Sequence, residues 1–164
     1  MVKKICGILF CLCIGVSAFA QARPKQVLAK ADIDNFIKNF DAIQEVLDAH
    51  EEELSSLVKE LNLAEGSELT AALAKIRGFS VSAALKSGLA QLGMGNNGFE
   101  KVMVILYGIA TVILDQMFQA MGSEEPEVTA MIEEQVRPMK AAIHASDLSL
   151  LSSRAQELVP LMDM

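Results

Sequence analysis

Cysteine is missing from all of this chain except its first thirteen residues. The 164-residue sequence contains Cys6, Cys11 and Cys13 and no others. All three lie inside a segment that we interpret below as a cleaved export signal. Once that segment is removed, no thiol remains for disulfide bonds, for thiolate metal ligation or for nucleophilic catalysis. The fold must then be held together by its core alone.

Aromatic side chains and positive charge are also scarce. The chain has no tryptophan and one tyrosine, which leaves few stacking platforms for sugars or nucleobases. It has 14 lysines and arginines against 21 acidic residues. Because Lys3 and Lys4 would leave with the signal, twelve positive charges would face 21 negative ones, a net charge of −9. That charge disfavours nucleic acid and anionic membrane surfaces as partners, since both would repel the protein.

Catalytic, cofactor and metal motifs are absent. The sequence has no Gly-x-Ser-x-Gly and no Cys-x-x-Cys-His. A di-iron bundle would need glutamate three residues before each histidine, but Leu47 precedes His50 and Ala141 precedes His144. We therefore predict a non-enzymatic protein without metal or cofactor, although the sequence leaves open carboxylate pairs that the fold brings together.

The two histidines have structural interpretations. His50 falls at a half-buried helix position, where its second ring nitrogen is expected to find a partner; a weak metal pair with Glu53 is the less favoured alternative. His144 is expected in the last turn of its helix, where a cation is stabilised by the helix dipole.

What the sequence does contain, first, is an export signal at residues 1–20. Two lysines precede an uncharged 12-residue stretch from Ile5 to Val16, which is too short to span the roughly 30 Å hydrocarbon core. Ala18 and Ala20 form the small-x-small pattern of a signal peptidase site, so Gln21 would become the new N-terminus. An uncleaved anchor would need a longer apolar run, and a lipoprotein a small residue before its cysteine. We expect an exported protein, periplasmic or secreted.

Helical periodicity follows a short polar lead at residues 21–30. Apolar side chains recur at alternating steps of three and four, which predicts a heptad seam over four repeats. The seam comprises Ile33, Phe36, Phe40, Ile43, Leu47, His50, Leu54, Leu57 and Leu61. We expect Asp32 to cap this helix, which is either one bent rod or two pieces divided near Phe40–Asp41. The Ile33–Leu61 seam is either buried inside one bundle or binds a protein partner or a second copy.

Two shorter helices rich in small residues should come next, over 68–77 and from Ser80 or Ser82 to Gly93, packed tightly on the core. The Gly93–Gly98 loop predicts a turn, with Asn97 capping the next helix. A phosphate cradle is excluded there because no Lys-Ser/Thr follows the glycines.

Phe99 to Met121 is the most apolar element and is expected as the central helix of the bundle. Its uncharged run is too short for a stable membrane span. A further helix should begin around Pro126 and bend at Pro138. The last helix is expected to be capped by Ser146 or Asp147 and to end at Pro160. Its inward residues are expected to be Leu148, Leu151, Ala155 and Leu158.

Eight methionines follow the signal, and core filling is their simplest interpretation. The alternative is a deformable apolar groove along the central helix, with room left beside a glycine. The candidate groove residues are Met103, Tyr107, Gly108, Met117 and Met121.

Together these features predict a single all-α domain over residues 31–164, a bundle of five or six helices. The predicted function is that of an exported, acidic, non-enzymatic interaction protein. The alternative is a carrier of an apolar small molecule or lipid in a Met-lined cavity.

Overall fold

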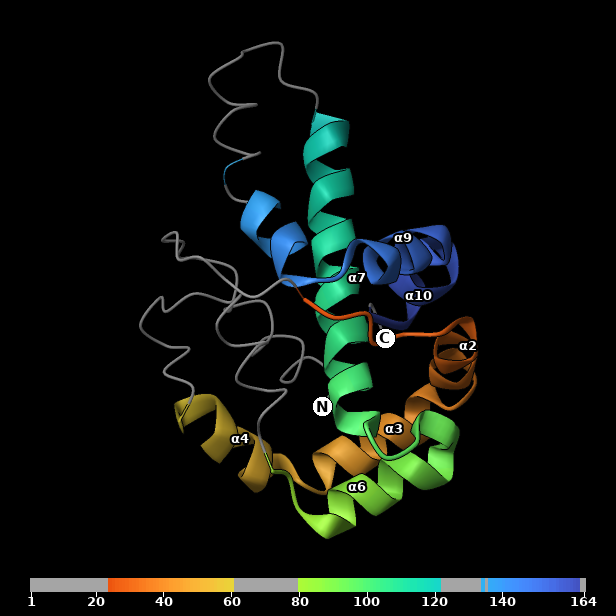
Figure 1. Ribbon diagram of the computed structural model, residues 1–164, viewed down its shortest axis with the longest axis vertical. Coiled ribbons are helices and arrows are strands. Elements are labelled where there is room, and N and C mark those ends of the chain that lie inside the picture. The colour runs from red at the N-terminus through yellow and green to blue at the C-terminus, as the bar shows by residue number, and fades with distance from the viewer. Residues whose placement is uncertain (1–23, 61–79, 122–133, 135, 163–164) are drawn as a thin grey trace.

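The computed structural model describes residues 24–60, 80–121, 134 and 136–162 (Figure 1). Within these ranges the chain is helical and has no β-strand, which confirms the all-α class. The elements are α2 (Lys30–Lys38), α3 (Phe40–Asp48), α4 (Glu51–Glu60), α6 (Ala83–Leu89), the π-helical turn η3 (Ala90–Met94), α7 (Gly98–Met121), α9 (Ala145–Ser153) and α10 (Ala155–Met162). Residues 136–142 are also helical. The expected count of five or six is not confirmed, because several expected helices are divided.

Some predictions lie outside the described residues. These are the signal at residues 1–20 with Ala18, Ala20 and Gln21, the seam position Leu61, the helix at 68–77 and the helix start around Pro126. They stay predictions.

The long helix α7 is the axis of the molecule. In Figure 1 it stands upright in the middle of the view, with α9 and α10 beside its middle and α3 and α6 at its N-terminal end. Three residues at successive turns, Val102, Ile105 and Ile109, are buried. The expected central helix is therefore present, and it begins at Gly98, directly after Asn97.

The predicted seam is kept in phase across three short helices. Its first five apolar members, from Ile33 to Leu47, are all at most 5 % exposed, and Leu57 is buried as well. The helix is interrupted at Asn39, whose φ of −113° and ψ of 22° are not helical, and again at residues 49–50. The Asn39 side chain explains the first break, because its amide donates to the carbonyls of Asn35 and Leu92, both at 3.1 Å. Asparagine side chains compete in this way with regular helix.

The sequence predicted Asp32 as the N-cap of α2, and this prediction is wrong. Asp32 is the third residue of the helix. The N-cap is Ala29, which has no polar side chain. The carboxylate of Asp32 reaches back and accepts the N–H of Ala29 at 2.8 Å. The N–H group of the N-cap residue is thus hydrogen-bonded by a side chain of the first helical turn, as in one half of a capping box.

The predicted cap and turn around α6 are confirmed. Ser82 Oγ accepts the N–H of Leu85 at 3.2 Å. Gly93 lies in the last turn of η3 with φ of 83°, and Gly95 caps it with φ of 73°. A wide last turn closed by a left-handed glycine and followed by a buried apolar residue, here Met94, is a common helix ending.

The last predicted helix is divided at Arg154, and Pro160 does not end it. Pro160 lies inside α10, which continues to Met162. A proline there removes the hydrogen bond to the carbonyl four residues earlier. Pro160 and Gln156 are both exposed, so this loss occurs at the surface of the protein.

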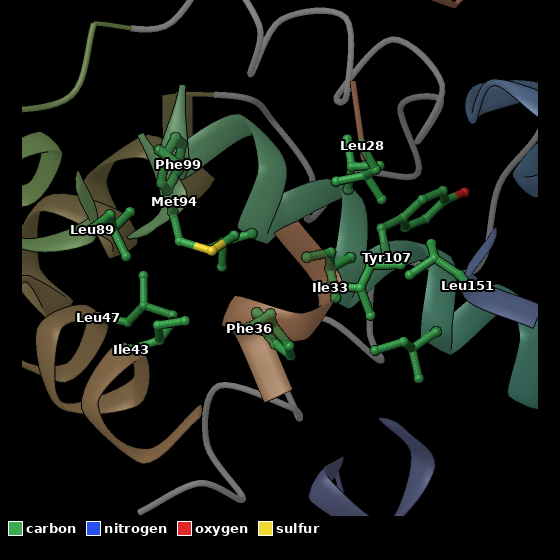
Figure 2. Packing of buried hydrophobic residues seen from close by; sticks show 14 of the residues in the cluster. Leu28, Ile33, Phe36, Ile43, Leu47, Leu89, Met94, Phe99, Tyr107 and Leu151 are labelled. Carbon is green, nitrogen blue, oxygen red and sulfur yellow. The ribbon is translucent and has the colours of Figure 1, made fainter. Parts of the chain in front are cut away.

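The buried side chains form one core with two lobes, which Figure 2 shows side by side. Met94 and Phe99 lie in one lobe with side chains of α3 and α6. Leu28 and Leu151 lie near Tyr107 in the other. Side chains of α2 lie between the lobes, so α2 is shared by both.

Candidate functional site

The candidate groove residues lie on α7 and differ in how far they are buried. Tyr107 is 2 % exposed, whereas Met117 is 54 % exposed and Met103 is half-buried. Gly108 is buried. The side chain of Met121 lies outside the described residues. A shared groove for all five residues therefore stays a prediction.

The space beside Gly108 is filled by side chains of the same chain. A Cβ atom at Gly108 would lie 2.2 Å from Leu151 Cδ1 and 3.4 Å from Ile143 Cδ1. Glycine at this position thus lets α9 approach the backbone of α7. The room that the sequence suggested for a ligand is occupied by Leu151 in this conformation.

Most of the described seam residues are buried within the chain, and His50 and Leu54 are half-buried. The face from Ile33 to Leu47 packs into the common core, and α2 and α3 contact η3, α6 and α7. A partner could reach this face only by displacing those helices. The outer faces of α2 and α3 carry the charged residues, such as Asp34, Asp41 and Glu45.

His50 has the structural role expected of it. The ring is half-buried, and Nδ1 lies 2.8 Å from the carbonyl oxygen of Val46. Because a carbonyl only accepts, Nδ1 carries the proton and donates.

His144 has a different role from the predicted one. It is the N-cap of α9, and its Nδ1 accepts the N–H of Ser146 at 3.2 Å. An accepting ring nitrogen is unprotonated, so the side chain acts as a neutral cap at a helix start. The prediction failed because residues 143–144 already break the preceding helix, which ends at 142.

Among the described residues the most buried charged group is Asp147, which the sequence offered only as one of two candidate helix caps. Its side chain is 0 % exposed. Oδ2 accepts the N–H of Val27 at 2.8 Å, and Oδ1 accepts the N–H of Leu28 at 3.1 Å. Both donors come from the segment predicted as a polar lead, in which Leu28 is part of the core. No sequence pattern links these residues, because about 120 positions separate them.

Asp32 joins α2 to α7 through its second oxygen. Lys101 Nζ lies 2.7 Å from Asp32 Oδ1, and both side chains are largely buried. The carboxylate therefore bridges the Ala29 N–H and the lysine ammonium.

Three further carboxylates make structural contacts nearer the surface. Glu53 Oε1 accepts the N–H of Ser82 at 2.6 Å, and this hydrogen bond lowers the pKa of Glu53 below its ordinary value. Arg154 pairs with Asp34 at 2.6 Å and with Glu157. Its hydrogen bond lowers the pKa of Glu157.

These contacts bring no metal-binding cluster together. Among the described residues, no group of three or more His, Cys, Asp or Glu side chains is arranged to hold an ion. Over the same residues, no single helix is both long and apolar enough to cross a membrane. The pair Ala83–Met94 and Gly98–Met117, bent by 68°, passes that test by length and composition only.

Comparison with known proteins gives no match to a protein-family model, to a curated protein or to a solved structure. The functional argument therefore depends on the residues of this chain.

Proposed function

We propose that this chain is an exported, non-enzymatic helical interaction protein. One observation carries the proposal. The groups that chemistry would most readily use, namely the two histidines and the buried carboxylates Asp32 and Asp147, are each bonded to the protein backbone. Side chains engaged in this way hold the fold together. Export is supported by the uncharged stretch and the Ala18-x-Ala20 pattern before Gln21.

The proposed contact uses the outer helix faces, because the Ile33–Leu61 seam is occupied by the chain's own helices over its described part. The net charge of −9 after cleavage favours a cationic partner and a salt-sensitive complex. A five-or-six-helix count for the whole domain, the periplasmic or secreted location and the absence of a cofactor belong to the same proposal.

The first test is the N-terminal residue of the exported form. Gln21 is expected, and Met1 would overturn the export proposal. The second test combines light scattering of the purified protein with cross-linking in an extract of the exported compartment. We expect a complex that weakens as salt is raised. A strict monomer without any cross-linked partner would contradict the interaction proposal.

A carrier of an apolar small molecule or lipid is the second candidate. It is favoured by one apolar face of α7 whose members are half-buried or exposed and recur at steps of three and four. These are Met103, Leu106, Ala110, Ile113 and Met117. The proposed carrier would bind its ligand along this face.

Native mass spectrometry tests the carrier proposal, with an apolar dye as probe. The variant Met117→Asp should reduce dye uptake, whereas Gln116→Asp, an exposed neighbour on another side of α7, should not. Absence of both co-purified ligand and dye uptake in the unaltered protein would exclude this candidate.

A further inference from the structure

The first described segment is a strap held by carboxylates. Residues 24–29, here called the N-terminal strap, have no regular secondary structure. In Figure 1 the strap crosses α7 and leads into α2. Three consecutive backbone amides of the strap, at residues 27, 28 and 29, each donate to a carboxylate oxygen. The first two share Asp147, and the third binds Asp32.

The two carboxylates belong to different parts of the molecule. Asp32 lies on α2, directly after the strap, and is also paired with Lys101 of α7. Asp147 is the third residue of α9. The Asp32 contact therefore holds the strap to α2, the helix that directly follows it in the sequence. The Asp147 contact holds the strap to the C-terminal helices.

Burial makes the Asp147 contact decisive for α9. A fully buried carboxylate is strongly unfavourable unless donors replace its lost water. Here the strap supplies two N–H donors, and the N-terminus of α9 adds the positive end of its dipole. If the strap leaves, Asp147 loses both strap donors and is stabilised by moving toward solvent. Because Asp147 lies within α9, that movement carries the helix with it.

The surface that α9 covers is the close contact on α7. Leu151 of α9 fills the space beside Gly108. Leu28 of the strap lies in the same lobe of the core, near Tyr107 and Leu151 (Figure 2). Displacement of α9 would therefore uncover the Gly108 stretch of α7, which is apolar and has a glycine at its centre.

An ion pair also ties α2 to the C-terminal helices. Arg154 pairs with Asp34, whose side chain is half exposed at 50 %. Exposed ion pairs contribute little to stability. Release of the strap from Asp147 should therefore do more to open this part of the molecule than loss of the Arg154–Asp34 pair.

We propose that the N-terminal strap is a latch. While residues 27 and 28 hold Asp147, α9 and α10 stay closed on α7. When the strap is released, α9 and α10 open together and expose an apolar cleft centred at Gly108, and α2, α3 and α6 stay folded. The latch is independent of both proposed functions, because it concerns an opening within the chain and its test measures no natural partner or ligand.

Hydrogen exchange of the whole exported chain, followed by mass spectrometry, tests the latch. In Asp147→Asn, one acceptor oxygen is replaced by an NH₂ group that cannot accept a strap amide. We expect exchange at least tenfold faster in the strap, α9 and α10, with α3 and α6 unchanged. Binding of an apolar fluorescent dye should rise in parallel. The matched control is Asp41→Asn, which removes the same charge from the exposed first turn of α3 and should change neither readout.

A second variant keeps the test decisive if Asp147→Asn does not fold. Leu28→Ala weakens the strap without altering α9 and should accelerate exchange in α9 and α10 as well. If Leu28→Ala loosens the strap alone, the coupling to α9 does not exist. If either variant accelerates exchange in all helices equally, these residues support global stability and there is no latch. Unchanged exchange in both variants would also overturn the proposal.

Discussion

The two lobes around α7 are built from different kinds of contact. At the N-terminal end of α7, η3 and α6 pack against α2 and α3. Neutral amides cap the chain turns there, since Asn35 and Asn39 donate to carbonyls of residues 93 and 92, and the Lys101–Asp32 ion pair joins α7 to α2. At the middle of α7, the N-terminal strap and α9 meet across about 120 residues through the buried Asp147.

The difference shows which half of the fold is robust. Neutral amide caps are made near the surface, and losing one leaves a carbonyl that water can reach. A buried carboxylate depends on every donor around it, because water does not replace a lost one. The lobe held by Asp147 should therefore be the first to open under stress.

The largest effect on stability is expected from a substitution in α2, the helix that both lobes share. Phe36 of α2 is fully buried and packs edge to face on Phe40, with ring centroids 5.5 Å apart. Phe36→Ala should lower the free energy of unfolding by about 3–5 kcal/mol, the usual cost of deleting a buried phenyl ring. Urea denaturation measures this, and the exposed Lys38→Ala should stay within about 0.5 kcal/mol. A loss confined to one lobe would show that α2 does not join them.

A pair of glycines compares the packing of the two lobes directly. A Cβ at Gly108 would overlap Leu151 at 2.2 Å, whereas one at Gly88 would meet the half-buried Val46 at 3.0 Å. Gly108→Ala should destabilise by about 1–3 kcal/mol through overpacking, partly offset by the better helix propensity of alanine. Gly88→Ala should be near neutral because its neighbour can shift. Thermal unfolding compares the two variants, and equal effects would contradict the closer approach of α9.

The amide caps of the first lobe should each contribute less. Asn39→Ala removes two hydrogen bonds, to the carbonyls of Asn35 and Leu92. We expect a loss of about 1–3 kcal/mol, since each of the two neutral hydrogen bonds contributes about 0.5–1.5 kcal/mol. The variant should also let α2 and α3 join into a longer helix, which circular dichroism would detect as unchanged or higher helicity. A fall in helicity would show that the break at Asn39 does not come from its side chain.

The smallest effect concerns Glu53 and depends on pH. The hydrogen bond from the Ser82 N–H lowers the pKa of the folded-state carboxyl below its ordinary 4.5. The charged form therefore stabilises the fold fully above that value, and the stabilisation is lost as the pH falls through the lower folded pKa. Glu53→Gln should cost under about 1 kcal/mol at neutral pH, since the group is near the surface.

The difference between wild type and Glu53→Gln should vanish in acid, because both side chains are then neutral acceptors. Urea denaturation at about pH 7 and about pH 3 measures it. The exposed Glu51→Gln in the same helix is the control. A difference that grows in acid would have the wrong sign for a lowered pKa.

Much of the helical pattern could be predicted, because it depends on neighbours along the chain. The spacing of Ile33 to Leu47 identified the buried face, and it stayed valid although the rod is broken. Ser82 and Gly93 were recognised as a start and an end, because capping involves residues within one turn. The predicted break near Phe40–Asp41 was one residue late, because the deciding partner of Asn39 is Leu92, far along the chain.

The candidate site was less predictable for the same reason. Gly108 was singled out as room for a ligand beside α7, and in the structure a side chain of α9 fills that space. His144 was assigned to the end of one helix when it caps the start of the next, a shift of two residues that reverses the favourable charge. Ser146 or Asp147 was predicted to cap the last helix, but its N-cap is His144. The partners of Asp147 in the strap had no signal in the sequence.

The sequence by itself determined that this is an all-α chain, which faces of its helices are apolar, and where glycine and serine punctuate them. Periodicity and capping depend on residues that are close in the sequence, so the spacing of residues is enough to predict them. The tertiary structure alone decided which carboxylate is buried, which segment satisfies it, and which side chain occupies the space at Gly108. Those outcomes depend on how distant helix faces pack, and a buried charge finds its donors only when the two ends of the chain meet.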